Sequence, residues 1–145
     1  MLADRVIILV SFIALILIIS IATKRWARTR LNRLQAQSST RLWQALGVEP
    51  DGRPTVVTFS TPSCAVCRSA QLPALQALEQ TVGSQLVRII KVNAAEHPEI
   101  ANAFGVLTVP TTIIMTTDGR VAAANNGFAP ADRLSLQVQS AAASG

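Results

Sequence analysis

The chain opens with an apolar segment. Residues 6–22 (VIILVSFIALILIISIA) contain only two polar residues, Ser11 and Ser20. As an α-helix this segment would be about 25 Å long, close to the ~30 Å thickness of bilayer hydrocarbon. The pattern predicts one N-terminal transmembrane helix within residues 1–23, with residues 6–23 in contact with lipid. A buried core helix is less favoured, because a small domain cannot surround a helix that is apolar on all sides.

A basic stretch follows the apolar segment. Residues 24–41 hold six Lys or Arg and no acid, and residues 24–39 are predicted to form a juxtamembrane linker. Positive charge near a span favours the cytoplasmic side, so a single-pass protein of the cell membrane with a cytoplasmic domain is expected. An extracytoplasmic domain is the alternative. A cleaved signal peptide is another, since Ser20-Ile21-Ala22 has a small-x-small pattern, but the positive charge follows the apolar run instead of preceding it.

Residues 40–145 show the pattern of an α/β domain. The first strand, TVVTFS at Thr55–Ser60, is β-branched and apolar, as expected for a strand buried on both faces. Trp43 is predicted to pack the first helix onto the sheet. The order of strands and helices predicts a three-layer α/β/α domain with a mixed central sheet, parallel in its first half and antiparallel in its second. The expected elements are helix 41–46, strand 55–60, helix 64–82, strand 85–92, helix 98–104, strands 109–115 and 121–124, and helix 131–142.

Composition and charge narrow the function. Hydrophobic residues make up 50% of the 145 residues and charged residues 14%, which is typical of a folded chain and not of a disordered one. The net charge of +5 comes entirely from the basic stretch, because residues 42–145 carry six bases and seven acids. A nucleic-acid-binding domain carries its basic surface on the folded body, so no nucleic-acid partner is expected.

The two cysteines lie at the turn from the first strand into the long helix. In Cys64-Ala65-Val66-Cys67 the first sulfur is at a helix N-terminus, where free N–H groups and the helix dipole stabilise a thiolate. Such cysteines fall from a pKa of about 8.5 to roughly 3.5–7.5. Arg68 adds a cation. The pattern predicts thiol–disulfide exchange, with Cys64 as nucleophile and Cys67 as the resolving thiol.

The exchange reaction needs no cofactor beyond the cysteine pair and no metal. Its partners would be protein disulfides or dithiols and an upstream thiol redox partner. Three alternatives stay open: a zinc half-site completed by His97 in an oligomer, a structural disulfide or pair of inert thiols, and a membrane-anchored binding or redox-sensing module without turnover.

From Thr55 to about Ala142 these residues resemble the thioredoxin family. The resemblance rests on VVTF, STPSC, Cys64-x-x-Cys67, Lys91, Asn93, Phe104-Gly105-Val106, Thr108–Thr111, Asp118-Gly119 and Gly127. It implies that Pro110 is cis, that the proline loop packs against the cysteines, and that Thr108, Val109 and Pro110 bind the substrate strand. The resemblance also assigns supporting positions to Pro62, Ser63, Arg68, Thr58 and Lys91.

The chain departs from the family pattern at four places. Ser63 stands where thioredoxins commonly have tryptophan, and Ala65-Val66 replaces the frequent Gly-Pro pair. Thr58 occupies the position of the family's buried acid, so Cys67 lacks an evident proton acceptor. Pro73 lies one residue beyond the family's helix-kinking proline.

Overall fold

The computed structural model describes residues 12–23, 25 and 39–145, and the chain divides into two compact units after Arg33. In the first unit residues 12–23 are helical, and the large apolar side chains from Phe12 to Ile21 are between 48% and 63% exposed. Residues 6–11 of the predicted anchor, and most of the predicted linker, lie outside the described residues. No helix among the described residues is long and apolar enough to span a membrane.

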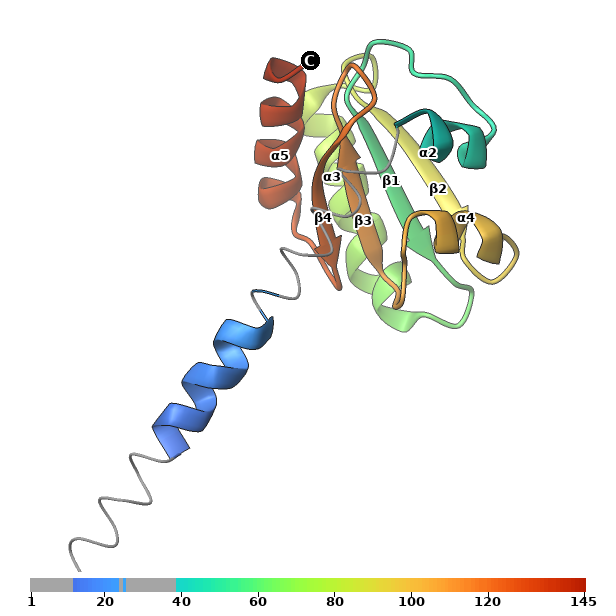
Figure 1. Ribbon diagram of the computed structural model, residues 1–145. Coiled ribbons are helices and arrows are strands. Elements are labelled where there is room, and N and C mark those ends of the chain that lie inside the picture. The colour runs from blue at the N-terminus through green and yellow to red at the C-terminus, as the bar shows by residue number, and fades with distance from the viewer. Residues whose placement is uncertain (1–11, 24, 26–38) are drawn as a thin grey trace, which may run out of the picture. The chain divides into compact units, whose positions relative to one another are not determined.

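The second unit is built on a four-stranded mixed sheet of order β2-β1-β3-β4 (Figure 1). β1 runs parallel to β2 and antiparallel to β3, and β3 and β4 form an antiparallel hairpin. The order and directions confirm the predicted parallel first half and antiparallel second half. The strands are β1 (Thr55–Ser60), β2 (Arg88–Asn93), β3 (Thr111–Met115) and β4 (Val121–Asn126).

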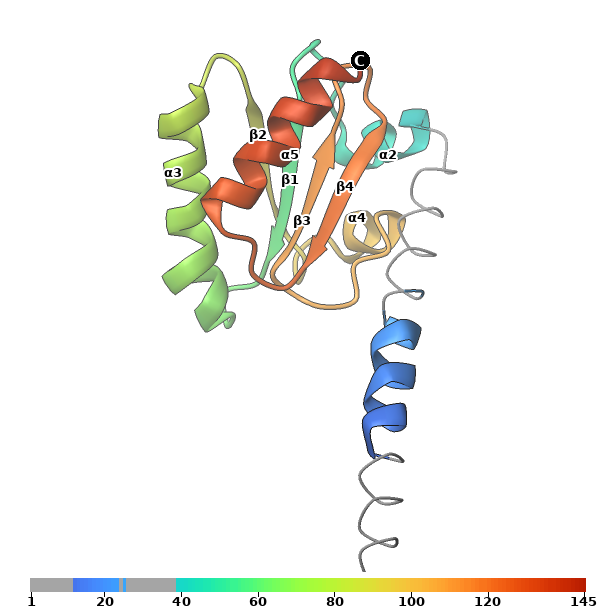
Figure 2. The same ribbon diagram turned by 90° about the vertical axis from the view of Figure 1, so that its left-hand side faces the viewer.

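Helices cover both faces of the sheet, which confirms the three-layer α/β/α architecture. α3 and α5 lie on one face, and α2 and α4 lie on the other (Figures 1 and 2). The helices are α2 (Ser39–Leu46), α3 (Leu72–Val82), α4 (Pro98–Ala103) and α5 (Ala131–Ala143).

Successive residues of β1 supply both cores, because the side chains of a strand alternate between its faces. Val56 packs with Leu75, Leu78 and Leu134 in the cluster beneath α3 and α5. On the other face the ring of Phe59 meets that of Phe104 with centroids 5.4 Å apart. All six of these residues are almost wholly buried, so β1 is the strand buried on both faces that the apolar pattern predicted.

The predicted bounds are wrong at the start of two strands. β2 begins at Arg88 instead of Gln85, because the chain turns at Gly83 and the Leu86 N–H bonds back to the Gly83 carbonyl. β3 begins at Thr111 instead of Val109, because Pro110 has no N–H to give to a ladder and its carbonyl accepts from Gly127.

The long helix is interrupted where the sequence predicted it to be continuous. After Ala65 and Val66 it widens into a π-helical turn, η1 (Cys67–Gln71), in which the N–H of Leu72 bonds to the Cys67 carbonyl. Pro73 follows at once. A proline has no N–H and its ring crowds the carbonyl four residues earlier, so a wide turn just before it relieves both problems.

Trp43 fastens α2 to the hairpin between β3 and β4. Its ring is 4% exposed, and its Nε1 donates a hydrogen bond to the Gly119 carbonyl at 2.9 Å. The contact confirms that Trp43 packs the first helix of this unit onto the rest of the domain.

Candidate active site

Three segments that are far apart in sequence meet at one end of the sheet. β1 leaves the sheet at Ser60 and leads into the cysteines. The register pairs Phe59 with Thr111, so the proline loop that enters β3 lies beside the exit of β1. Thr111 pairs in turn with Asn126, which places the segment after β4 next to the proline loop. The topology therefore builds a site from residues 61–71, 106–110 and 127–130.

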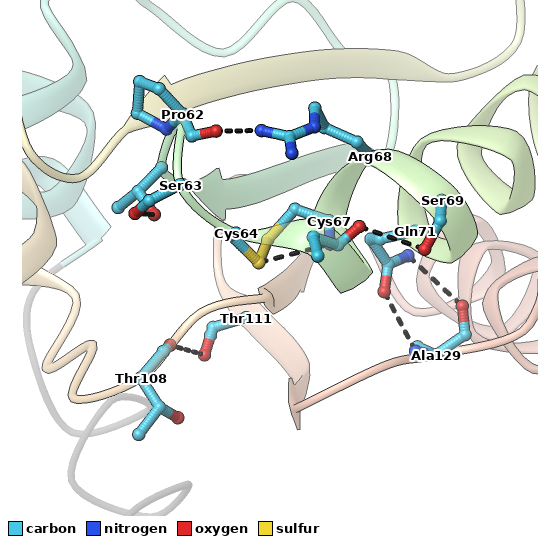
Figure 3. Close-up of a disulfide and its surroundings, with 12 residues drawn as sticks. Pro62, Ser63, Cys64, Cys67, Arg68, Ser69, Gln71, Thr108, Thr111 and Ala129 are labelled. Atoms are coloured by element: carbon cyan, nitrogen blue, oxygen red, sulfur yellow. Dashed lines mark hydrogen bonds between the residues drawn. A yellow bond between two sulfur atoms is a disulfide. The ribbon is translucent and has the colours of Figure 1, made fainter.

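Cys64 and Cys67 form a disulfide, with Cα atoms 5.3 Å apart (Figure 3). Cys64 is partly exposed, whereas Cys67 is 6% exposed. Because only a sulfur that solvent reaches can meet a disulfide of another protein, the two sulfurs have different access to a partner. This asymmetry suits an attacking and a resolving cysteine.

The start of the helix presents a donor to the first sulfur. The main-chain N–H of Cys67 donates to the Cys64 Sγ at 3.2 Å. A hydrogen bond to the charged form of a group stabilises that form, so this donor favours a Cys64 thiolate after reduction. The cation predicted beside the pair has another contact: the Arg68 guanidinium donates to the Pro62 carbonyl across the turn (Figure 3). Arg68 therefore fastens the exposed Pro62–Ser63 turn to the helix.

A pocket of about 280 Å³ lies behind the buried cysteine. Thr58 and Lys91 are paired across β1 and β2, and both line this pocket with Cys67 and Arg68. Thr58 is 4% exposed, and its antiparallel partner Thr112 has a buried hydroxyl without a hydrogen-bond partner among the described residues. The structure thus brings three of the five predicted supporting residues, Thr58, Arg68 and Lys91, to one pocket with Cys67, and the wall of this pocket contains hydroxyls and bases but no acid.

The proline loop enters β3 at the same end of the sheet as the disulfide. The Val109–Pro110 peptide is cis, as the resemblance implied. The Thr108 carbonyl accepts from the Thr111 hydroxyl at 2.7 Å, which closes the loop. Pro110 is buried, while Thr108 is exposed and Val109 is partly exposed. Thr108 and Val109 also line a pocket of about 290 Å³ that reaches Thr61.

Sequence reasoning missed two residues of this end of the sheet. Gln71 ends the π-helical turn, is 2% exposed, and hydrogen-bonds both main-chain groups of Ala129 (Figure 3). Phe128, the residue before Ala129, has a side chain that is 46% exposed. A signal for Gln71 existed, because it is a polar residue on the apolar stripe that continues through Leu75 and Leu78. The exposure of Phe128 had no such signal.

The zinc alternative receives no support from the described residues. His97 precedes α4 with its side chain 52% exposed, and its Nδ1 lies 3.3 Å from Glu99 Oε1. Within residues 12–23, 25 and 39–145 no group of three or more His, Cys, Asp or Glu could hold a metal ion.

A mixed sheet that carries a Cys-x-x-Cys disulfide at a helix start, beside a cis-proline loop, defines a dithiol–disulfide exchange domain. The chain belongs to the thioredoxin family: the family model Thioredoxin matches residues 38–140. The family acts through a redox-active cysteine pair, and the chain is a thiol-disulfide oxidoreductase with Cys64 and Cys67 as that pair.

Individual relatives are thioredoxins. The chain is 31% identical to the thioredoxin of Bacillus subtilis over 91 residues, which are 63% of this chain and 85% of the relative. It is 36% identical to that of Rhodospirillum rubrum over 87 residues, 60% of this chain and 80% of the relative. The solved thioredoxin of Fasciola hepatica superposes with a TM-score of 0.53 at 26% identity, covering 61% of this chain and 81% of that one.

Proposed function

We propose that the protein is a membrane-tethered thiol-disulfide oxidoreductase that exchanges disulfides with protein substrates, and that Cys64 attacks while Cys67 resolves. The observation that carries the assignment of roles is the difference between the sulfurs. Cys64 is the more accessible one and accepts the Cys67 N–H at 3.2 Å, whereas Cys67 is buried.

In the reducing direction the dithiol donates two electrons. The Cys64 thiolate attacks one sulfur of a substrate disulfide, the substrate S–S bond breaks, and the other substrate sulfur leaves as a thiolate that takes a proton. The Cys67 thiolate then attacks the Cys64 Sγ, which re-forms the Cys64–Cys67 bond and releases the second substrate thiol. The reverse sequence oxidises a substrate dithiol.

The proline loop is the proposed platform for the substrate chain. Val109 is partly exposed, and no hydrogen bond of its main-chain groups occurs within the described part of the chain. An extended substrate segment can pair with a free main-chain N–H and C=O as an added strand does. Thr108 and Pro110 then fix the position of the substrate sulfur relative to Cys64. An upstream dithiol or disulfide protein must exchange electrons with the oxidised or reduced pair after each turnover.

Reduction of insulin by the purified protein with a dithiol reductant tests the roles. Cys64→Ser abolishes turnover and forms no mixed disulfide. Cys67→Ser also loses turnover, but when it is mixed with insulin without the reductant it accumulates a mixed disulfide through Cys64, because no second thiol is present to resolve it. A mixed disulfide that forms on Cys67 in Cys64→Ser, and not on Cys64 in Cys67→Ser, reverses the assignment.

The membrane tether is proposed from the apolar run of residues 6–22 and the basic stretch that follows it. The exposed apolar side chains of the helix at residues 12–23 support it, since such a helix is stable where lipid covers it. We expect the full chain to stay with membranes after alkaline extraction, and a chain that starts at Leu34 to be released. Release of both contradicts the tether.

The six bases of residues 24–41 favour a cytoplasmic domain. A thiol reagent that does not cross membranes should therefore label Cys64 only after permeabilisation of the cells. The Cys64→Ser, Cys67→Ser double variant gives the background. Labelling of Cys64 in sealed cells places the domain on the other side of the membrane.

A redox-sensing module without turnover is the second candidate, and one observation favours it. Thr58 cannot accept a proton as a carboxylate does, and the wall of the pocket behind Cys67 contains no acid. A sensor needs only one slow exchange, whereas an enzyme needs repeated fast ones. Wild-type protein that forms the mixed disulfide but does not turn over insulin is the outcome that supports the sensor.

A further inference from the structure

We infer that Gln71 is a positioning residue that determines protein-substrate specificity by fixing the loop that carries Phe128, at the same end of the sheet as the cysteine pair. This inference rests on the proposed function and concerns which substrates the same site accepts. Gln71 touches neither sulfur in Figure 3 and instead points toward Ala129.

The first step is the geometry of the Gln71 amide. Its Nε2 donates to the Ala129 carbonyl at 3.2 Å, and its Oε1 accepts from the Ala129 N–H at 2.9 Å. Gln71 is 2% exposed and Ala129 is 0% exposed. Each of these buried groups would be costly to leave without a partner, so the two bonds fix the loop to the helix.

The second step is the attachment at the other end of the same loop. The Gly127 N–H donates to the Pro110 carbonyl at 2.8 Å. Phe128 therefore lies between two fastened residues, one tied to the proline loop and one tied to the cysteine helix. The backbone of Phe128 is therefore restrained on both sides, and its side chain is 46% exposed.

The third step is the π-helical turn. Gln71 is the last residue of η1 (Cys67–Gln71), the turn that begins at the buried cysteine. A π-helical turn adds a residue relative to an α-helix over the same rise and so rotates the residues that follow it. The turn that carries Cys67 thus also directs the Gln71 side chain toward Ala129.

The partner that fits this arrangement is an extended polypeptide with an apolar side chain near its disulfide. Val66, between the cysteines, is 48% exposed, and Leu107, ahead of the proline loop, is 70% exposed. With Phe128, each of the three segments at this end of the sheet carries one exposed apolar side chain. A small disulfide reaches the sulfur without covering Phe128, whereas a polypeptide covers it.

The experiment compares two oxidants against the same reduced protein in single-turnover mixing. Insulin presents an apolar polypeptide, and 5,5′-dithiobis(2-nitrobenzoic acid) presents only a small disulfide. We expect Phe128→Ala to lower the second-order rate constant with insulin about tenfold and that with the small disulfide no more than about twofold. Phe128→Leu, which keeps an apolar side chain, should recover most of the rate with insulin.

Gln71→Met keeps the length of the side chain and loses both hydrogen bonds. Like Phe128→Ala, it should lower the rate constant with insulin much more than that with the small disulfide. The double variant should lose little more of the insulin rate than the more affected single variant, because Gln71 acts through Phe128. Amide exchange at Ala129 should speed up in Gln71→Met whether or not the protein is active. If Gln71→Met does not fold, Gln71→Glu takes its place, since a carboxylate keeps the bond from the Ala129 N–H but cannot donate to its carbonyl.

Val138→Ala is the matched control for lost stability, because it removes buried volume from α5 in the core beneath α3, away from the cysteines. It should weaken folding without changing the ratio of the two rates. Equal losses with both oxidants, or additive losses in the double variant, overturn the role of Gln71. A wild-type protein that reduces the small disulfide but not insulin contradicts the proposed protein substrates instead. In that case amide exchange still tests the positioning role, because an unchanged exchange rate at Ala129 in Gln71→Met rejects it.

Discussion

Thr58 is the residue that most separates this site from a typical thioredoxin active site, because it leaves Cys67 facing hydroxyls and bases. We expect Thr58→Asp to accelerate the resolving step about tenfold or more near neutral pH, since a positioned carboxylate can accept the Cys67 proton. Thr112, the antiparallel partner of Thr58, has a buried hydroxyl that can donate to the new carboxylate. Single-turnover reduction of insulin measures the rate.

The same substitution should cost stability in a pH-dependent way. Burial raises the pKa of the new carboxyl above its unfolded value of about 3.9. The penalty is therefore absent below that value and grows as the pH rises, until the pH passes the folded pKa. Thr58→Asn is the control, because it has the same shape and does not ionise. A rate equal to that of Thr58→Asn means that the Cys67 proton leaves by another route.

At the residue scale, the pairing of the two cysteines could be predicted from the sequence, because it depends only on residues close to them in the chain. Two sulfurs three residues apart at a helix start need only that helix to come together, and the disulfide confirms it. Gln71 could not be found in this way. Its partner Ala129 is 58 residues away, and no local pattern indicates which loop a buried amide meets.

The hairpin between β3 and β4 is the element whose turn depends most on a glycine. Gly119 has φ +84°, and a Cβ there would lie 2.5 Å from Trp43 Nε1. Gly105 has a similar φ of +60°, but a Cβ there would meet nothing within 4 Å. Comparing alanine substitutions at Gly119 and Gly105 therefore separates two losses of stability: that of a left-handed backbone and that of displacing Trp43.

We therefore expect Gly105→Ala to cost about 1–2 kcal/mol of unfolding free energy, the backbone penalty alone. Gly119→Ala should cost roughly 1–3 kcal/mol more, because it also crowds the buried ring and disturbs its hydrogen bond. Urea denaturation of the two variants measures the difference. Equal costs would mean that α2 moves away from the hairpin without penalty.

The same hairpin should respond to acid. The Thr116 hydroxyl, and after it Arg120, donates hydrogen bonds to Asp118 and holds the pKa of that carboxyl below its ordinary 3.8. A lowered folded pKa gives stability that is present above the unfolded value and lost as the pH falls through the folded one. Asp118→Asn should thus be less stable than wild type near neutrality, and the difference should shrink as the pH falls below 3.8 and vanish below the lowered folded pKa. Urea denaturation at several pH values measures the difference, and a difference that does not change with pH would contradict the prediction.

At the scale of helices and strands, the bounds were predicted best where the residues are buried. Both ends of β1 were predicted correctly, because its short run of β-branched and apolar residues is typical of a strand buried on both faces. The start of β2 was predicted three residues too early, because Leu86 is apolar but 65% exposed in a turn. The π-helical turn of η1 was missed for a different reason: the apolar stripe through Leu75 and Leu78 that indicates the helix lies after the turn and carries no sign of it.

At the scale of the whole molecule, the three layers and the parallel and antiparallel halves of the sheet followed from the sequence, since short connections and right-handed crossovers leave few ways to arrange these elements. The sequence alone could not give the long-range contacts that complete the site. The Gly127 bond to Pro110 and the Gln71 bonds to Ala129 join the segment after β4 to the proline loop and to the cysteine helix, and they form only once the sheet has been assembled.

The division of the chain after Arg33 leads to the last prediction. The strands, the cores on both sheet faces and all three segments of the site belong to the unit from Leu34 to Gly145. A chain that starts at Leu34 should therefore fold with one cooperative transition and reduce soluble insulin within about twofold of the rate of the full chain in detergent. In that case the proposed tether contributes location and not chemistry. A much slower short chain, with an unchanged unfolding transition, would show that the first 33 residues take part in the reaction itself.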